Sequence, residues 1–202
     1  WLTGSYDPDL NLTYWGIGNP GPDWNPEQRP GDNLYSDCVV ALNADTGELE
    51  WYFQFTPNDD YDYDSVQIPV LVDYPAQDGS TLKLMLWGNR NGFFYVLDRQ
   101  NGQFVSGDPY VFVNWAESLD DTGRPVETPQ AEGEPTFPGV QGGTNWYSPS
   151  YSPSTELFYL SAWEGYGSIF EAESAEYEPG RLFLGGRPGN ALPGAPVIPG
   201  IR

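Results

Sequence analysis

Acidic and aromatic residues alternate in one short stretch of the chain. Residues 59–64 read DDYDYD, directly after Thr56, Pro57 and Asn58. In an extended strand residues i and i+2 share a face, and tyrosine favours strands. We therefore expect Asp60, Asp62 and Asp64 to point to one side, where they could hold a hard cation or combine a general base with a metal ligand. An acidic surface loop is the alternative that these residues alone leave open.

The charge balance and the absence of histidine exclude several other chemistries. The 202 residues carry a formal net charge of -21, with 29 acidic and 8 basic side chains. Binding nucleic acid needs basic patches, so we expect no nucleic-acid partner. Without histidine, Ser-His-Asp and Cys-His catalysis and His-ligated zinc are excluded within these residues.

The single cysteine and the hydropathy give little information on the compartment. Cys38 lies in the apolar run of residues 38–42, and we expect it to be a buried thiol. It cannot form a disulfide within the chain, so cysteine usage does not fix the compartment. No apolar run is long enough to span a membrane. The chain begins on Trp1, in the middle of a pattern, and we expect it to be an internal segment of a longer protein.

The composition favours short strands over helices, so we expect strands and turns to position the acidic residues 59–64. The chain has 24 glycines, 20 prolines and 16% aromatic residues, a balance typical of many short strands joined by turns. Residues 170–178 are the best candidate for a short helix. The Pro- and Gly-rich residues 20–32, and residues 116–144, are expected to be irregular loops. In a repeat array such loops usually form a binding face.

Three segments of the chain repeat at a regular period. Residues 1–15 and 146–160 share Trp, Ser, Tyr, Pro, Leu and Tyr at identical spacing, at an offset of 145. Residues 84–91 match residues 12–19 at an offset of 72. Strand-rich repeats of this kind predict a propeller or a solenoid.

Hairpin signals support the propeller interpretation. Residues 41–51 read as strand, tight turn and strand, and Trp51 supplies a large apolar plate that can dock on the next unit. Residues 96–104 are a weaker copy in which Asn101-Gly102 marks the turn. Residues 121–123 give a third turn of the same kind.

In the order and spacing of these motifs, the chain resembles the pyrroloquinoline quinone (PQQ)-dependent alcohol dehydrogenases, which include the methanol dehydrogenase large subunits. The resemblance implies an all-β fold, an eight-bladed β-propeller with PQQ near its axis. At the observed period, residues 1–202 would supply just under three blades of this single domain. The residues that carry the resemblance are Trp1 with 5–8, 16–20, 29–33, 41–51, 56–63, 89–92, and 145–146 with 150–151.

The resemblance assigns catalytic and cofactor-binding roles. Asp62 matches the base that takes the alcohol proton, and Arg90 matches the arginine that donates to the quinone oxygens and pairs with that base. Trp1 matches the tryptophan under the PQQ ring, and Asn145 and Trp146 match positions beside the cofactor. From the residues alone, Trp1 could equally be a core tryptophan and Arg90 a turn residue.

The resemblance also implies a metal site. Asn19, Asp62 and Asp64 match metal ligands, and Gly16 and Gly18 would let the backbone approach the site. Calcium-type members usually carry a small residue at the position of Asp64, whereas lanthanide-type members carry Asp. We therefore expect a lanthanide(III) ion in preference to Ca²⁺. A glutamate ligand and a vicinal disulfide would lie upstream of this segment.

The same family implies the wider function. We expect oxidation of an alcohol, electron transfer to a cytochrome c and a periplasmic location, and a homodimer is left open. Two alternatives remain: a dehydrogenase of sugars or polyols, and a non-catalytic propeller scaffold of the outer-membrane assembly type. The combination of Asn19, Asp62 and Arg90 argues against the scaffold. Two departures, Asn58 in place of a family His and an inserted Asp23, are not expected to touch the chemistry.

Overall fold

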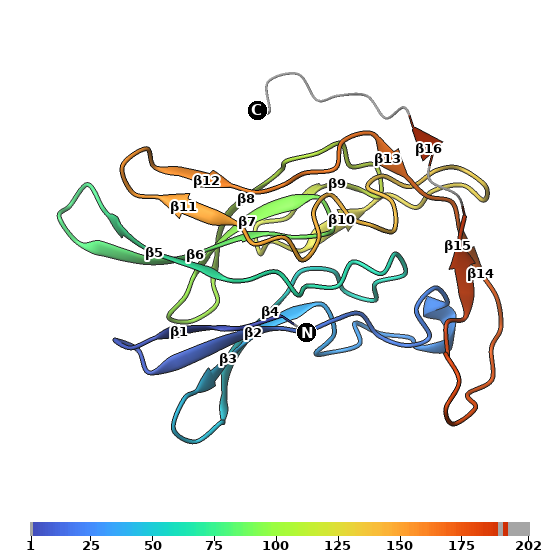
Figure 1. Ribbon diagram of the computed structural model, residues 1–202, viewed down its shortest axis with the longest axis horizontal. Coiled ribbons are helices and arrows are strands. Elements are labelled where there is room, and N and C mark those ends of the chain that lie inside the picture. The colour runs from blue at the N-terminus through green and yellow to red at the C-terminus, as the bar shows by residue number, and fades with distance from the viewer. Residues whose placement is uncertain (1, 190–191, 194–202) are drawn as a thin grey trace.

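Two four-stranded antiparallel sheets form the body of the computed structural model, which describes residues 2–189 and 192–193 (Figure 1). In each sheet the strands pair in chain order, as in the blade of a propeller. The first sheet contains β1 (Ser5–Asp7), β2 (Leu12–Gly16), β3 (Cys38–Asn43) and β4 (Leu49–Gln54). The second contains β5 (Val70–Pro75), β6 (Thr81–Gly88), β7 (Phe93–Asp98) and β8 (Phe104–Pro109).

A hairpin of β11 (Ser150–Ser152) and β12 (Leu157–Tyr159) begins a third unit. In Figure 1 this orange hairpin lies on one side of the green second sheet, and the blue first sheet lies on the other. The expected partial propeller is therefore confirmed, with two complete blades and the start of another.

The strand registers repeat with the sequence. Ser5 pairs with Tyr14 in the first blade, and Ser150 pairs with Tyr159 at the same offset of 145 in the third unit. The first and second blades also carry a register shift at equivalent places, between Ala41 and Leu42 and between Val96 and Leu97. The sequence repeat thus reflects a repeat of backbone pairing.

The remaining strands form three short pairs beside the blades. They are β9 (Ala116–Leu119) with β10 (Pro125–Glu127), β13 (Tyr166–Gly167) with β16 (Leu192–Pro193), and β14 (Phe170–Ala172) with β15 (Gly186–Pro188). The helix expected at residues 170–178 is wrong. Phe170 starts a strand there, and its ring packs edge-on against Tyr61 with centroids 5.3 Å apart. Residues 116–144 are likewise not wholly irregular, because they hold β9 and β10 around the predicted turn.

Among the described residues, the sole helical element is the 3-10 turn η1 (Pro26–Gln28), inside the loop that was expected to be irregular. No helix in this part of the chain has the length and apolar character needed to cross a membrane. Cys38 is fully buried, as expected, and burial raises the pKa of its thiol.

Trp51 docks the first blade onto the second, as predicted. Its ring lies over the turn of the next hairpin, where a Cβ added to Gly102 would come within 2.5 Å of the ring atom Cε3. Tyr14 packs on the same ring, with centroids 5.6 Å apart. A glycine is therefore required at this turn both for its φ of +76° and for the close approach of the tryptophan.

A buried ion pair also joins the two blades. Arg99 donates from Nε to Asp7 Oδ2 at 2.6 Å and from Nη2 to Asp73 Oδ1 at 2.7 Å. The other oxygen of Asp7 accepts the backbone N–H of Asp9 in the turn after β1. This pair fixes the first hairpin of one blade against the second blade.

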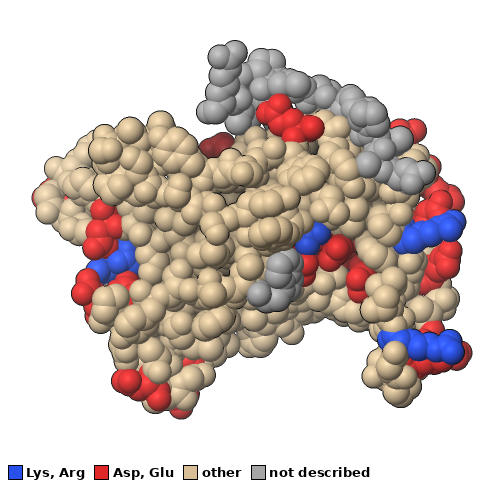
Figure 2. Space-filling view, in the orientation of Figure 1, with Lys and Arg blue, Asp and Glu red and all other residues tan. Residues whose placement is uncertain are grey.

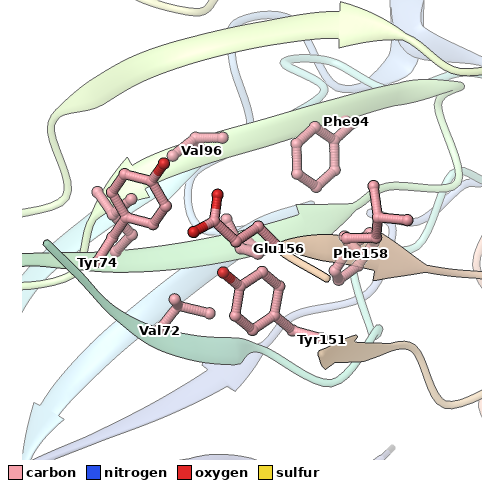
Figure 3. A pocket seen from close by; sticks show the side chains of 10 residues that line it. Val72, Tyr74, Phe94, Val96, Tyr151, Glu156 and Phe158 are labelled. Atoms are coloured by element: carbon pink, nitrogen blue, oxygen red, sulfur yellow. The ribbon is translucent and has the colours of Figure 1, made fainter. Parts of the chain in front are cut away.

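An apolar groove of about 280 Å³ separates the second blade from the β11–β12 hairpin. Figure 3 shows the polar ends of Tyr74, Tyr151 and Glu156 gathered at one end, and Phe94 lies beside Phe158 at the other, with ring centroids 5.0 Å apart. None of the candidate site residues lines this groove. Uncharged side chains cover most of the face in Figure 2, and charged ones gather at its periphery and in one patch nearer the middle.

Candidate functional site

The acidic tract forms a loop between β4 and β5, so the strand expected there is wrong. Asp59 reverses the chain by accepting the backbone N–H groups of Tyr61 at 2.9 Å and Tyr63 at 2.7 Å. Asp62 then adopts a left-handed φ of +61°. An aspartate that bonds to nearby backbone amides competes with strand pairing, which explains the difference.

The predicted division of the tract into two sides holds for Asp62 and Asp64 but is wrong for Asp60, whose carboxyl lies on the side of Glu127 and Arg29. The rings of Tyr61 and Tyr63 both pack on Trp115, with centroids 5.7 and 5.5 Å away. The hydroxyl of Tyr63 donates to the backbone carbonyl of Pro138. The tyrosines therefore anchor the loop in the core, while Asp62 and Asp64 turn towards Arg90.

Arg90 is the centre of the cluster. It lies in the turn between β6 and β7, is 4% exposed, and donates from Nη1 to Asp64 Oδ2 at 2.6 Å. Its Nη2 is 3.4 Å from Asp62 Oδ2 and also donates to the carbonyl of Val140. The expected pairing with Asp62 exists, but the closer partner is Asp64. Asn89 fixes the turn by donating to the Ser65 hydroxyl at 2.8 Å.

The segment that carries Asn19 lies directly against Asp64. The backbone N–H of Asn19 donates to Asp64 Oδ1 at 2.9 Å. A Cβ on Gly18 would come within 2.5 Å of the same oxygen, and one on Gly16 would collide with the carbonyl of Ser65. The expectation that glycines allow the backbone to approach the site is confirmed.

The loop of residues 139–145 encloses Arg90 from the other side. The N–H of Gly143 donates to the Arg90 carbonyl at 2.8 Å. Asn145 is buried at the end of this loop and donates to the carbonyl of Gln141 at 3.0 Å. The neighbouring Trp146 is 52% exposed. Among the described residues, no hydrogen bond joins Asn145 or Trp146 to the two carboxylates. Trp1 lies outside the described residues.

Burial controls the protonation of the acidic side chains. Burial raises the pKa of Asp62 to about 7, although the charge of Arg90 lowers it. Burial likewise raises the pKa of Asp59 to about 8 and that of Asp60 to about 6. The charges of Glu127 and Arg29 act on Asp60, so Asp60 faces away from the Arg90 cluster.

Two aspartates have larger roles than the sequence indicated, and a third was not singled out at all. Asp59, interpreted as a turn residue, shapes the loop that presents Asp62. Burial raises the pKa of Asp23, while a hydrogen bond from the Asn19 side chain lowers it and the Asp64 charge raises it, so the inserted Asp23 lies next to Asn19. Asp37 is fully buried at the start of β3. The one sequence signal for it was an acidic residue directly before a buried apolar run.

The donor set fits part of a metal site. Asn19, Asp62 and Asp64 offer an amide and two carboxylates, the oxygen ligands that Ca²⁺ and lanthanide ions take. In the described part of the chain, no three acidic or cysteine side chains are close enough to hold an ion by themselves. The oxygens of these three side chains are fewer than the roughly six to eight that Ca²⁺ takes.

Successive four-stranded antiparallel blades define the class of the fold, a β-propeller, and a carboxylate–arginine cluster lies between the loops of its blades. Residues 1–107 match the PQQ family described as the glucose/ethanol/alcohol dehydrogenase β-propeller domain. This match covers more than half of the chain, and the chain belongs to that family.

Similar proteins support the assignment. The chain is 42% identical over 197 residues to the quinoprotein alcohol dehydrogenase PedH of Pseudomonas putida, covering 92% of this chain and 33% of PedH. It is 41% identical over 169 residues to the quinohemoprotein alcohol dehydrogenase of Comamonas testosteroni, covering 80% of this chain and 24% of that protein. The solved structure of a europium-containing methanol dehydrogenase matches with a TM-score of 0.86 and 38% identity, covering 95% of this chain and 34% of that one. The chain thus spans about a third or less of the length of these relatives.

Proposed function

We propose that the whole protein oxidises an alcohol to an aldehyde with PQQ and passes the electrons to a cytochrome c in the periplasm. The observation that carries the proposal is the convergence of Asn19, Asp62 and Asp64 on Arg90, in a chain of the PQQ alcohol dehydrogenase family. When bound, the quinone accepts hydride from the alcohol carbon, and a metal ion polarises the quinone carbonyl.

Asp62 is the general base for the alcohol proton. Burial raises its pKa to about 7, and a base is most effective when its pKa lies near the working pH. Its left-handed backbone, fixed by the turn at Asp59, places the carboxylate beside Arg90. Arg90 orients that carboxylate and directs its permanent charge at the position where negative charge develops on the cofactor.

Asn19, Asp62 and Asp64 hold the cation together with ligands from outside this segment, and Asp64 favours a lanthanide(III) ion over Ca²⁺. An added carboxylate compensates the higher charge of a trivalent ion. The likeness to a europium-containing methanol dehydrogenase supports this preference. Trp1, Asn145 and Trp146 line the cofactor pocket. Trp146 is half-exposed and offers an aromatic surface to a planar ring.

The test is alcohol oxidation by the full-length enzyme loaded with PQQ and metal. We expect Asp62→Asn to lower kcat by about 10²- to 10⁴-fold, the usual contribution of a general base. The absorbance of bound PQQ should be retained. Asp60→Asn is the matched control, because its side chain faces Glu127 and Arg29 instead of Arg90. Normal turnover in Asp62→Asn would exclude the assigned base.

A sugar or polyol is the second candidate substrate. The description of the matching family includes glucose beside ethanol and other alcohols. The two curated relatives described above are alcohol dehydrogenases, which favours a simple alcohol. Comparing kcat/KM for ethanol and for glucose in the same assay distinguishes them, and a higher value for glucose would overturn the preference.

A further inference from the structure

Asp37 carries a buried carboxylate that has no partner. Its exposed fraction is 0%, and among the described residues neither Oδ1 nor Oδ2 has a hydrogen-bond partner. The other buried aspartates differ in this respect. Asp7 binds Arg99, and Asp59 accepts two backbone N–H groups. An unpaired buried charge is strongly unfavourable, so the ionised form of this carboxyl group requires a compensating cation.

The backbone of Asp37 joins the two segments that form the candidate metal site. Its N–H donates to the Gly18 carbonyl at 3.1 Å, one residue before Asn19. Its own carbonyl accepts the N–H of Phe55 at 2.8 Å, at the start of the acidic loop. Asp37 has a left-handed φ of +50°, a conformation that non-glycine residues keep at some cost.

The side chain of Asp37 faces the same cluster. Burial raises its pKa, the charges of Asp59, Asp64 and Asp62 raise it further, and Arg90 lowers it. The backbone contact of Asp37 with Gly18, where an added Cβ would lie 2.5 Å from Asp64 Oδ1, places Asp37 beside the same residues. Neighbouring carboxylates raise the pKa of an aspartate and a neighbouring guanidinium lowers it, as these residues do for Asp37.

If all of its members were ionised, the acidic groups of this cluster would outnumber the local cations. Six aspartates gather around the loop, against the guanidinium groups of Arg29 and Arg90. Arg90 is already paired with Asp62 and Asp64. Arg29 donates to neutral oxygens: the carbonyls of residues 22, 23 and 59 and the side-chain amides of residues 33 and 58. The six aspartates are at positions 23, 37, 59, 60, 62 and 64.

We propose that Asp37 is a specificity-determining residue of the cation site, which strengthens the binding of a trivalent ion over a divalent one by its charge, without ligating the ion. This inference rests on the proposed function, in which Asn19, Asp62 and Asp64 contribute ligands. The attraction between Asp37 and the ion is proportional to the charge of the ion. Asp37 therefore influences which metal ion binds, although it is not itself a ligand.

The test is cation binding to the full-length enzyme carrying PQQ and no metal, measured by calorimetry with La³⁺ and with Ca²⁺. We expect Asp37→Asn to weaken La³⁺ binding by about 10- to 100-fold, as for other residues that act behind a metal site. On a logarithmic scale, the loss for Ca²⁺ should be about two-thirds as large, in proportion to ionic charge. Asp121→Asn removes one exposed carboxylate with no side-chain contact and should bind both ions like the wild type.

The thermal stability of the metal-free enzyme separates this role from a structural one. Because the Asp37 carboxylate has no partner to lose, Asp37→Asn should not lower the Tm of the metal-free protein. The smaller Asp37→Ser is measured beside it, so that the result does not depend on one variant. Unchanged La³⁺ affinity, an equal loss for the two ions, or a lowered Tm would each overturn the inference. Failure of the wild type to bind either ion would instead refute the metal site of the proposed function, and the role of Asp37 with it.

Discussion

Arg90 holds Asp64 more tightly than Asp62, with 2.6 Å between Nη1 and Asp64 Oδ2 against 3.4 Å between Nη2 and Asp62 Oδ2. The second oxygen of Asp64 accepts the backbone N–H of Asn19. Asp64 is therefore fixed by donors at both oxygens. Asp62 keeps a longer contact to one of its oxygens, which leaves it able to accept a proton. The two carboxylates thus have different environments despite being two residues apart, as their separate proposed roles require.

The close approach of Gly18 to Asp64 gives a first prediction. In Gly18→Ala the new Cβ would lie 2.5 Å from Asp64 Oδ1 and would displace the carboxylate. We expect La³⁺ affinity of the full-length enzyme to fall about tenfold or more, measured by calorimetry. Gly21→Ala is the control, since its nearest neighbour would be 3.9 Å away. Equal affinities of the two variants would contradict the placement of Asp64.

The contact between Trp51 and Gly102 gives a second prediction, on stability. Gly47 and Gly102 occupy corresponding turns with φ of +73° and +76°, so alanine at either position introduces similar backbone strain. A Cβ at Gly47 has no neighbour within 4 Å, whereas one at Gly102 meets the Trp51 ring at 2.5 Å. We expect Gly102→Ala to cost about 1–3 kcal/mol more than Gly47→Ala, the usual range for overpacking. Chemical denaturation of the full-length protein measures the difference, and equal losses would mean that the docking contact adds no stability.

The ion pair between the blades gives a third prediction, on acid stability. Burial raises the pKa of Asp7, but the hydrogen bond and charge of Arg99, together with the backbone N–H groups of Leu10 and Asp9, outweigh it, and the net pKa lies below its ordinary value. A carboxyl group whose pKa is lowered by folding contributes stability above its ordinary pKa, and this stability is lost as the pH falls through the folded value. The free energy of unfolding should therefore decrease below about pH 4, and less steeply in Asp7→Asn.

At neutral pH, Asp7→Asn should cost about 3–5 kcal/mol, because Arg99 loses one partner of a buried pair. The control is Asp9→Asn, which breaks an exposed pair with Lys83 and should cost at most about 1 kcal/mol. Unfolding curves at several pH values measure both effects. A variant at Asp7 as stable as the one at Asp9 would show that the pair does not join the blades.

Much of the fold followed from repeats and turn residues. The match between residues 1–15 and 146–160 anticipated identical strand registers, because the same side chains must face the same neighbours in each blade. The turn residues around Gly47 and Gly102 predicted the two hairpins. The large apolar ring of Trp51 predicted that it docks on the next blade. The strand at Phe170 was not, because its pairing with residues near 187 and its contact with Tyr61 depend on distant parts of the chain.

The clustering of Asp62, Asp64 and Arg90 was anticipated, but the geometry of the cluster was not. The alternation of aspartate and tyrosine correctly separated Asp62 and Asp64 from the two tyrosines. The backbone that achieves it is a loop closed by Asp59, since two backbone amides bind one carboxylate there. Asp37 could not be predicted for a related reason. Its burial depends on residues far away in sequence, and a single aspartate before a strand does not indicate that it will be buried.

The central claim, a cation site in which Asp64 favours a trivalent ion, is tested most directly by reconstitution. The metal-free full-length enzyme with PQQ is supplied with La³⁺ or with Ca²⁺, and alcohol oxidation is measured for the wild type and for Asp64→Ala. We expect the wild type to be at least about tenfold more active with La³⁺, and Asp64→Ala to lose most of that activity. Equal activity of the wild type with Ca²⁺, or unchanged La³⁺ activity in Asp64→Ala, would contradict it.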